Sequence, residues 1–159
     1  RAVPRRGAIG IFNRSHYEAV LVERVLFDLP HRVLRQRYRQ IVDFERMLVE
    51  NGVVVLKFCL HLGRAEQAER LAERLTLPRK KWKFSRADLD VRRQWKDYAE
   101  AYEDMLNATS HPRARWHLVP ADRNWYRDYV IARTVVRAME GLRLKWPKPR
   151  EDLSKIRID

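Results

Sequence analysis

Cysteine, glycine and long apolar runs are all scarce in this sequence. Cys59 is the only cysteine and lies inside an apolar run, which predicts a buried structural thiol and excludes a disulfide framework. The five glycines include no Gly-Lys dipeptide, so this chain carries no glycine-rich phosphate-binding loop of the Walker type. No apolar run approaches the roughly 20 residues that cross a bilayer, and residues 1–12 lack the layout of a secretory signal peptide. We therefore expect a cytoplasmic protein with no membrane partner.

Positive charge is what the sequence has in excess. Lys and Arg number 34 against 21 Asp and Glu, which gives a formal net charge of +13. Such a surplus attracts anionic partners and speeds their capture, without saying which anion is bound. Part of the surplus is concentrated in "LPRKKWKFSR" (residues 77–86), which holds five cations, two aromatics and a proline. This stretch predicts a loop that binds a polyanion.

The spacing of apolar residues predicts strands that alternate with helices. The stretch "GAIGIF" (residues 7–12) is typical of a buried strand, and "VVVLKFCL" (residues 53–60) of a strand covered on both faces. Strands alternating with helices indicate an α/β domain with a parallel sheet. The remaining expected elements are a third strand within "RWHLVPAD" (residues 115–122), a helix over residues 31–50, a helix marked by Ala68 to Leu75 that ends before Pro78, a helix from Ser85 to about Asn107, a last helix to about Gly141, and a docked extended tail over residues 144–159.

Ligands of an open α/β sheet bind beyond the carboxyl ends of its strands. That rule selects the three segments after the predicted strands, which are residues 12–18, 61–67 and 120–125. Arg14 stands two residues beyond the first predicted strand, where a guanidinium could bind an anion or could pair with a helix carboxylate. Both interpretations remain open for Arg14.

Two further charged residues stand beside these segments. Lys57 interrupts an apolar strand near its predicted carboxyl end, where a buried ammonium is costly unless it is paired. An active-site anion or a salt bridge to a buried carboxylate would satisfy it, and we favour the active-site face. Asp122 is expected to cap the final helix, next to the site.

Three ordered motifs carry a family resemblance. They are "IFNRSHYEAVLVERV" (residues 11–25), the run from Lys57 to Trp95 that contains "HLGRAEQAERLAERLTLPRKKWKFS", and "WHLVPADRNWYRDYV" (residues 116–130). With them the chain resembles the polyphosphate kinase 2 family from Gly7 to Asp159, in the branch with "FNRSHYE". The resemblance implies a P-loop kinase with a three-layer, thymidylate-kinase-like fold, a parallel sheet and a helical lid. It also implies transfer of the terminal phosphoryl group of inorganic polyphosphate to a nucleoside mono- or diphosphate (AMP giving ADP, or ADP giving ATP), with Mg²⁺.

The same resemblance implies roles for residues. Asn13 and Arg14 would be catalytic, with Arg14 holding the phosphate of the acceptor nucleotide, and Glu18 would lie at the acceptor and metal site. The lid would span about residues 76–93 and face polyphosphate. Because Arg70 and Arg74 are four residues apart, they share a helix face that leads into this lid. The expected polyphosphate-binding residues are Lys57, Arg70, Arg74, Lys80, Lys81 and Lys83.

The sequence also departs from the family pattern. The family's phosphate-binding loop lies upstream of "RGAIGIF", so residues 1–159 are expected to form a partial P-loop kinase domain without its amino-terminal strands. The connection from Leu26 to Arg32 is shorter than usual, and Arg115 stands where proline is common. Homo-oligomers are common in the family, so we expect one here. The competing hypotheses are a catalytically incomplete remnant that binds polyphosphate, and a nucleic-acid-binding module, which the interleaved acidic residues disfavour.

Overall fold

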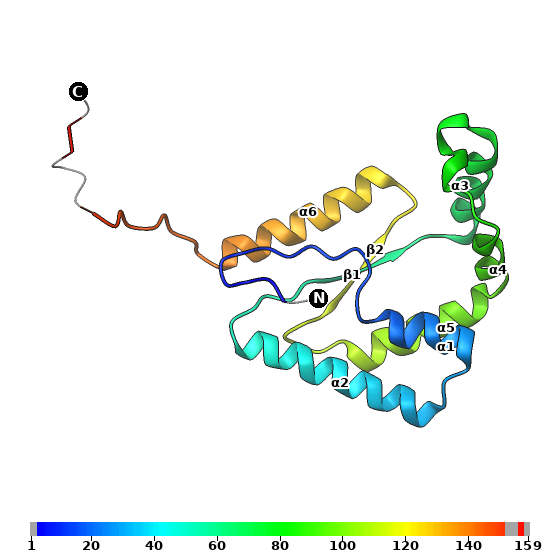
Figure 1. Cartoon of the computed structure of the whole chain (residues 1–159), viewed down its shortest axis with the longest axis horizontal. Helices are drawn as coiled ribbons and strands as arrows, with labels where there is room; N and C mark the ends of the chain where they lie inside the picture. Colours follow the sequence, from blue (N-terminus) through cyan, green and yellow to red (C-terminus); the bar gives the residue numbers. More distant parts are fainter. Residues whose placement is uncertain (1–2, 152–155, 158–159) are drawn as a thin grey trace.

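The computed structural model describes residues 3–151 and 156–157. These residues form an α/β fold that is mostly helical around a small sheet (Figure 1). Its elements in chain order are α1 (Glu18–Phe27), α2 (His31–Glu50), β1 (Lys57–His61), α3 (Arg64–Thr76), a 3-10 helix η1 (Pro78–Lys83), α4 (Ala87–Arg93), α5 (Trp95–Thr109), β2 (Trp116–Pro120) and α6 (Asn124–Gly141). None of the helices in this described part is long and apolar enough to cross a membrane.

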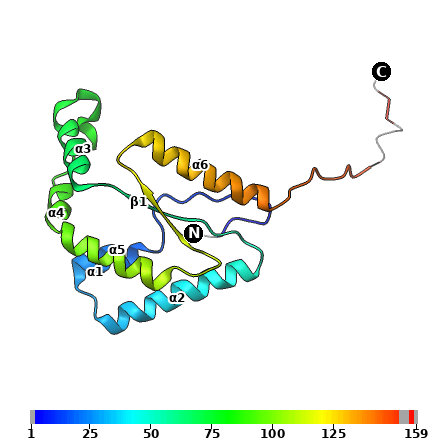
Figure 2. The same ribbon diagram turned by 180° about the vertical axis from the view of Figure 1, so that it is seen from behind.

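The sheet consists of two parallel strands with helices on both sides. Strands β1 and β2 pair in register from Lys57 opposite Trp116 to His61 opposite Pro120. Helix α6 lies on one side of the strands, and α1, α2 and α5 lie on the other, as two opposite views show (Figures 1 and 2). Because the strands are parallel, both carboxyl ends lie at the same edge, where α3 and α6 begin.

The main core lies between α1, α2 and α5. Helix α2 shows why, since its buried residues Leu34, Tyr38 and Ile41 recur at helical spacing and the remaining face is charged. The predicted bounds of this helix are confirmed, and it ends where Asn51 donates through its side-chain amide to the Met47 carbonyl oxygen. The core consists of Tyr17, Val20, Leu21, Leu34, Tyr38, Ile41, Ala101 and Met105.

The structure corrects two predicted strands. Residues 7–12 form no strand, and the side chains of Ile9 and Ile11 are 73% and 92% exposed. An extended apolar run needs a neighbouring strand to satisfy its backbone groups, and the described sheet offers none beside it. The second strand begins four residues later than predicted, at Lys57, and is not covered on both faces because Leu60 remains half exposed.

The structure also corrects the predicted third helix and the tail. The helix expected from Ser85 is divided at Gln94 into α4 and α5. Residues 144–151 are extended as expected, but they are exposed and lead away from α6 rather than docking (Figure 1). Trp146 is 95% exposed, so its ring has no apolar partner to hold the tail down. Residues 152–155 and 158–159 of the predicted tail lie outside the described part.

Candidate functional site

Hydrogen bonds connect the carboxyl ends of β1 and β2 and the loops that follow them. The Ala121 backbone N–H donates to the His61 carbonyl oxygen at 2.8 Å, and the Gly63 N–H donates to the Asp122 Oδ1 at 2.7 Å. A Cβ on Gly63 would stand 3.0 Å from the same carboxylate, so this close approach favours glycine. Asp122 therefore does not cap α6, whose N-cap is Arg123 without a side-chain hydrogen bond. The predicted capping role is wrong because the loop after β1 takes up this carboxylate instead.

Arg70 extends this junction into α3. Its guanidinium donates to the Glu66 Oε1 at 2.7 Å and to the carbonyl oxygens of Ala121 and Asp122 at 2.9 Å each. These contacts attach α3 to the loop after β2. Arg70 was predicted to bind polyphosphate, but in this structure its donors serve the protein itself.

Arg74 has a similar structural use one turn later. It donates to the Asp88 Oδ2 at 2.7 Å, which ties α3 to α4, and lies 3.4 Å from the Lys83 carbonyl oxygen. Arg92 returns from α4 to the Gln67 Oε1 and the Arg64 carbonyl oxygen, at 2.8 Å each. Helix α3, η1 and α4 are thus held together as one arm, which projects from the carboxyl edge (Figure 1). We call residues 64–93 the lid arm, after the lid predicted at about residues 76–93 within it.

The lysines of the lid arm differ in their surroundings. Lys80 is paired with Glu73, whereas Lys81 and Lys83 are exposed. The Lys83 Nζ lies 5.1 Å from the ring centroid of Trp82, a residue that is itself 78% exposed. The arm therefore presents cations and an aromatic face to solvent, which are the groups that a phosphate chain or a nucleotide could use.

The predicted acceptor residues lie against α5. Arg14 is exposed at a φ of 63°, with its NH1 3.4 Å from the Glu18 Oε2, so the helix-carboxylate pairing left open for it is present. Burial raises the pKa of Tyr98 and of Tyr102 on α5, the Glu18 carboxylate raises both pKa values further, and the Arg14 cation opposes the shift. Helix α1, which begins at Glu18, packs against α5. Asn13, which precedes Arg14, is exposed.

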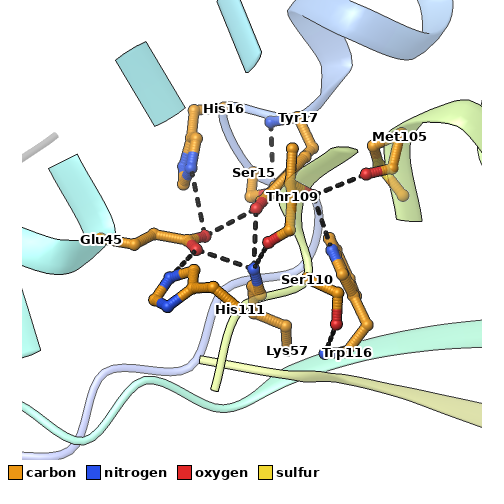
Figure 3. Close-up of polar contacts among 10 residues, drawn as sticks. All are labelled: Ser15, His16, Tyr17, Glu45, Lys57, Met105, Thr109, Ser110, His111 and Trp116. Carbon is orange, nitrogen blue, oxygen red and sulfur yellow. Dashed lines mark hydrogen bonds and ion pairs between the residues drawn. The ribbon is translucent and has the colours of Figure 1, made fainter. Parts of the chain in front are cut away.

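Lys57 lies in a buried network rather than at a ligand surface (Figure 3). It is the first residue of β1 and not near its carboxyl end. Its Nζ donates to the Glu45 Oε2 at 2.7 Å, the Thr109 carbonyl oxygen at 2.8 Å and the Tyr17 hydroxyl at 3.0 Å. Burial lowers the pKa of Lys57, and the Glu45 carboxylate opposes that shift. The structure therefore favours the salt-bridge alternative for Lys57 over the predicted polyphosphate contact, because all three ammonium donors are used inside the protein.

Metal ligands are sparse in this arrangement. In residues 3–151 and 156–157, no three His, Cys, Asp or Glu side chains are grouped so that they could hold a metal ion. Phosphoryl-transfer sites often bind Mg²⁺ with one or two carboxylates and the substrate's own phosphates. The Glu18 carboxylate, half exposed at the start of α1, fits such a single-ligand role.

Comparisons with known proteins point to one family. Residues 1–146 match the family described as Polyphosphate kinase 2. An AMP/ADP-polyphosphate phosphotransferase of Meiothermus ruber is 48% identical over 157 residues, which are 99% of this chain and 59% of that protein. An ADP-polyphosphate phosphotransferase of Rhodopseudomonas palustris is 39% identical over 93% of this chain and 55% of its own length.

A solved structure agrees with the fold. The crystal structure of polyphosphate kinase 2 from Arthrobacter aurescens has a TM-score of 0.93 at 41% identity, over 96% of this chain and 54% of that one. The α/β class predicted from the sequence is thereby confirmed. The chain spans a little over half the length of these relatives.

Proposed function

The chain belongs to the polyphosphate kinase 2 family, and from that premise we propose that the whole protein transfers the terminal phosphoryl group of inorganic polyphosphate to AMP or ADP in the cytoplasm. The observation that carries the proposal is the lid arm, whose exposed Lys81 and Lys83 extend from the carboxyl edge of a parallel sheet. That edge is where open α/β sheets bind ligands. Lysines act as point charges on phosphate and do not demand one register along a repeating chain.

The proposed chemistry relies on alignment and charge neutralisation. Phosphoryl transfer needs the attacking and leaving oxygens in line and the charge of the transferring group stabilised. In this proposal the lid arm holds the polyphosphate chain, and Arg14, with Asn13 beside it, holds the phosphate of the acceptor nucleotide. Bound Mg²⁺ would neutralise phosphate charge, with the Glu18 carboxylate as one of its ligands.

The finer architecture is part of the same proposal. We infer the three-layer arrangement of a P-loop kinase, in which further parallel strands pair with the two-stranded sheet in the whole protein. In support, a sheet of only two strands is marginal by itself, and the chain spans only 59% of the length of the Meiothermus ruber relative.

A catalytically incomplete remnant is the second candidate. The specific observation in its favour is that the 159 residues contain no Gly-Lys dipeptide and hence no phosphate-binding loop. Such a protein would bind polyphosphate through the lid arm without turnover. The same surface could also bind nucleic acid, because both ligands are polyphosphates.

ATP formation from ADP, polyphosphate and Mg²⁺ tests the proposal directly. We expect the purified protein to form ATP only when all three are present, and chelation of Mg²⁺ should abolish the signal. Retained polyphosphate binding by the whole protein without ATP formation would contradict the proposal and support the remnant. Bound duplex DNA that a great excess of short polyphosphate does not displace would identify a nucleic-acid-binding module instead.

A further inference from the structure

A buried ion pair contacts the segment that carries Arg14 and Glu18 through the side chain of Tyr17. Glu45 of α2 and Lys57 of β1 are 1% and 6% exposed, and 2.7 Å separates their charged atoms. The Tyr17 hydroxyl stands between them, since it donates to the Glu45 Oε1 at 2.7 Å and accepts from the Lys57 Nζ at 3.0 Å (Figure 3). One side chain of the acceptor segment is thus fastened to two elements far from it in the sequence.

Trp116 and Thr109 hold the Tyr17 ring and the Lys57 ammonium in this arrangement. The Tyr17 and Trp116 rings meet edge to face at 4.7 Å, and the Lys57 Nζ lies 5.0 Å from the Trp116 centroid. The Trp116 indole N–H donates to the Thr109 hydroxyl at 2.9 Å, and that hydroxyl donates to the Met105 carbonyl oxygen at 2.7 Å. Helix α5 and strand β2 therefore hold the ring of Tyr17 while α2 and β1 hold its hydroxyl.

Stability alone does not explain a buried pair of this kind. Desolvating two charges costs about as much as their attraction returns, and apolar replacements of buried pairs are often neutral or stabilising. What such a pair can supply is one defined geometry. The segment it fastens needs such support, because Arg14 has a left-handed backbone that costs free energy unless its surroundings impose it.

We propose that Tyr17, held by Glu45 and Lys57, is a positioning residue that presents Arg14 and Glu18 to the acceptor nucleotide. The inference rests on the proposed function, since it assigns these three residues to the acceptor side of that reaction. Tyr17 lies three residues after Arg14 and directly before Glu18, so the backbone that its side chain anchors carries both. Lys57 thus contributes to phosphate binding through Tyr17 and not by contact.

Two tyrosines of the same core offer a matched test. Tyr17 and Tyr38 are 4% and 7% exposed and belong to one cluster, but the Tyr38 hydroxyl lies outside the network of Glu45 and Lys57 in the described part of the chain (Figure 3). Tyr17→Phe removes the hydroxyl that Glu45 and Lys57 hold and keeps the ring. Tyr38→Phe removes a hydroxyl outside the network, and is the control.

Steady-state kinetics should separate positioning from general damage. We expect Tyr17→Phe to raise the KM for ADP about tenfold and to change the KM for polyphosphate less than about twofold, because a hydrogen bond to charged groups is lost on the acceptor side only. Tyr38→Phe should leave both KM values near those of the wild type. An unchanged KM for ADP, an equal rise in both KM values, or the same rise in Tyr38→Phe would overturn the inference.

Amide hydrogen exchange over residues 13–18 gives a readout that does not depend on turnover. Tyr17→Phe should accelerate exchange in this segment, while Tyr38→Phe should not. If the wild type forms no ATP, the proposed function fails, and unchanged exchange in Tyr17→Phe would then overturn the positioning role separately. If Tyr17→Phe folds poorly, Glu45→Leu with Lys57→Met takes its place, since apolar replacement of the pair is tolerated and still frees the Tyr17 hydroxyl.

Discussion

At the residue scale, His16 lies at the rim of the buried ion pair. Its Nε2 is 3.9 Å from the Glu45 Oε1, and its ring meets the Phe44 ring edge to face at 5.8 Å. Burial lowers the pKa of His16 below its ordinary value of 6.5, the Glu45 carboxylate opposes the shift and the Lys57 ammonium adds to it. His111 also faces the pair, with its Nε2 3.5 Å from the Glu45 Oε2. Protonating His16 is therefore less favourable in the folded state than in the unfolded one.

The pH dependence of stability follows from the sign of that shift. As the pH falls through 6.5, His16 is protonated first in the unfolded state. The stability that is present above pH 6.5 is therefore lost progressively as the pH falls toward the lowered pKa of the folded state. We expect His16→Gln to lose less unfolding free energy than the wild type between about pH 7.5 and about pH 5 in urea titrations. His31→Gln, at an exposed histidine, is the control. A wild-type-sized loss in His16→Gln would contradict the prediction.

Sequence reasoning singled out several charged residues but did not find the partners within the protein that the structure gives them. Lys57 was conspicuous because an ammonium in an apolar strand needs a counter-charge, and the salt-bridge alternative proves to be the correct one. A signal for its partner existed, since Glu45 continues the helical stripe of Leu34, Tyr38 and Ile41. That stripe was interpreted through its apolar members only. Pairings between residues far apart in sequence, such as Gly63 with Asp122, have no local signature at all.

At the element scale, the lid arm is a preformed unit with exposed lysines. The Arg74–Asp88 and Arg92–Gln67 contacts brace it internally, and Arg70 fastens it to the loop after β2. The side chains of Lys81 and Lys83 are exposed and take no part in these contacts, so both lysines can be replaced without breaking them. The element can therefore be tested without dismantling it.

Replacing both exposed lysines should weaken one substrate selectively. We expect Lys81→Ala with Lys83→Ala to raise the KM for polyphosphate about tenfold or more and the KM for the nucleotide far less, because two phosphate-binding charges are lost from the lid arm alone. Steady-state kinetics with each substrate varied in turn measures this. Lys96→Ala, at an exposed lysine on α5 outside the arm, should change neither value. An equal effect on both substrates would rule out the lid assignment.

The predicted elements succeeded most fully where a long pattern was available, although the short strand predicted within residues 115–122 is also present as β2. Twenty residues of amphipathic spacing followed by Asn51-Gly52 were enough to predict α2 with its correct bounds. Six apolar residues at 7–12 could not define a strand, because a strand depends on a partner that lies elsewhere in the fold. Gln94 separates two stretches that each have helical spacing, so no local signal in the sequence marks the boundary between α4 and α5.

At the scale of the whole molecule, the described surface combines a high net charge with open apolar area. Each strand of the two-stranded sheet has one unpaired edge, and Leu60 and Leu118 on those strands are 50% and 58% exposed. Ile9, Ile11 and Phe12 are exposed as well. Free strand edges with apolar side chains promote pairing with another chain, whereas a charge of +13 opposes it at low salt. The balance therefore depends on ionic strength.

Self-association of the purified chain follows from this balance. At a salt concentration of about 0.3 M, where surface charge is screened, we expect an apparent mass above the 19.2 kDa of the chain that rises with protein concentration. Leu60→Lys should reduce the association, because a lysine on an edge strand disfavours pairing at that edge. Leu75→Lys makes the same change at a 55% exposed leucine on α3, away from the sheet, and should leave the mass unchanged. Light scattering coupled to size exclusion measures all three proteins. A monomer at every concentration would show that these edges do not associate, and equal effects of the two substitutions would assign the association to charge rather than to the sheet.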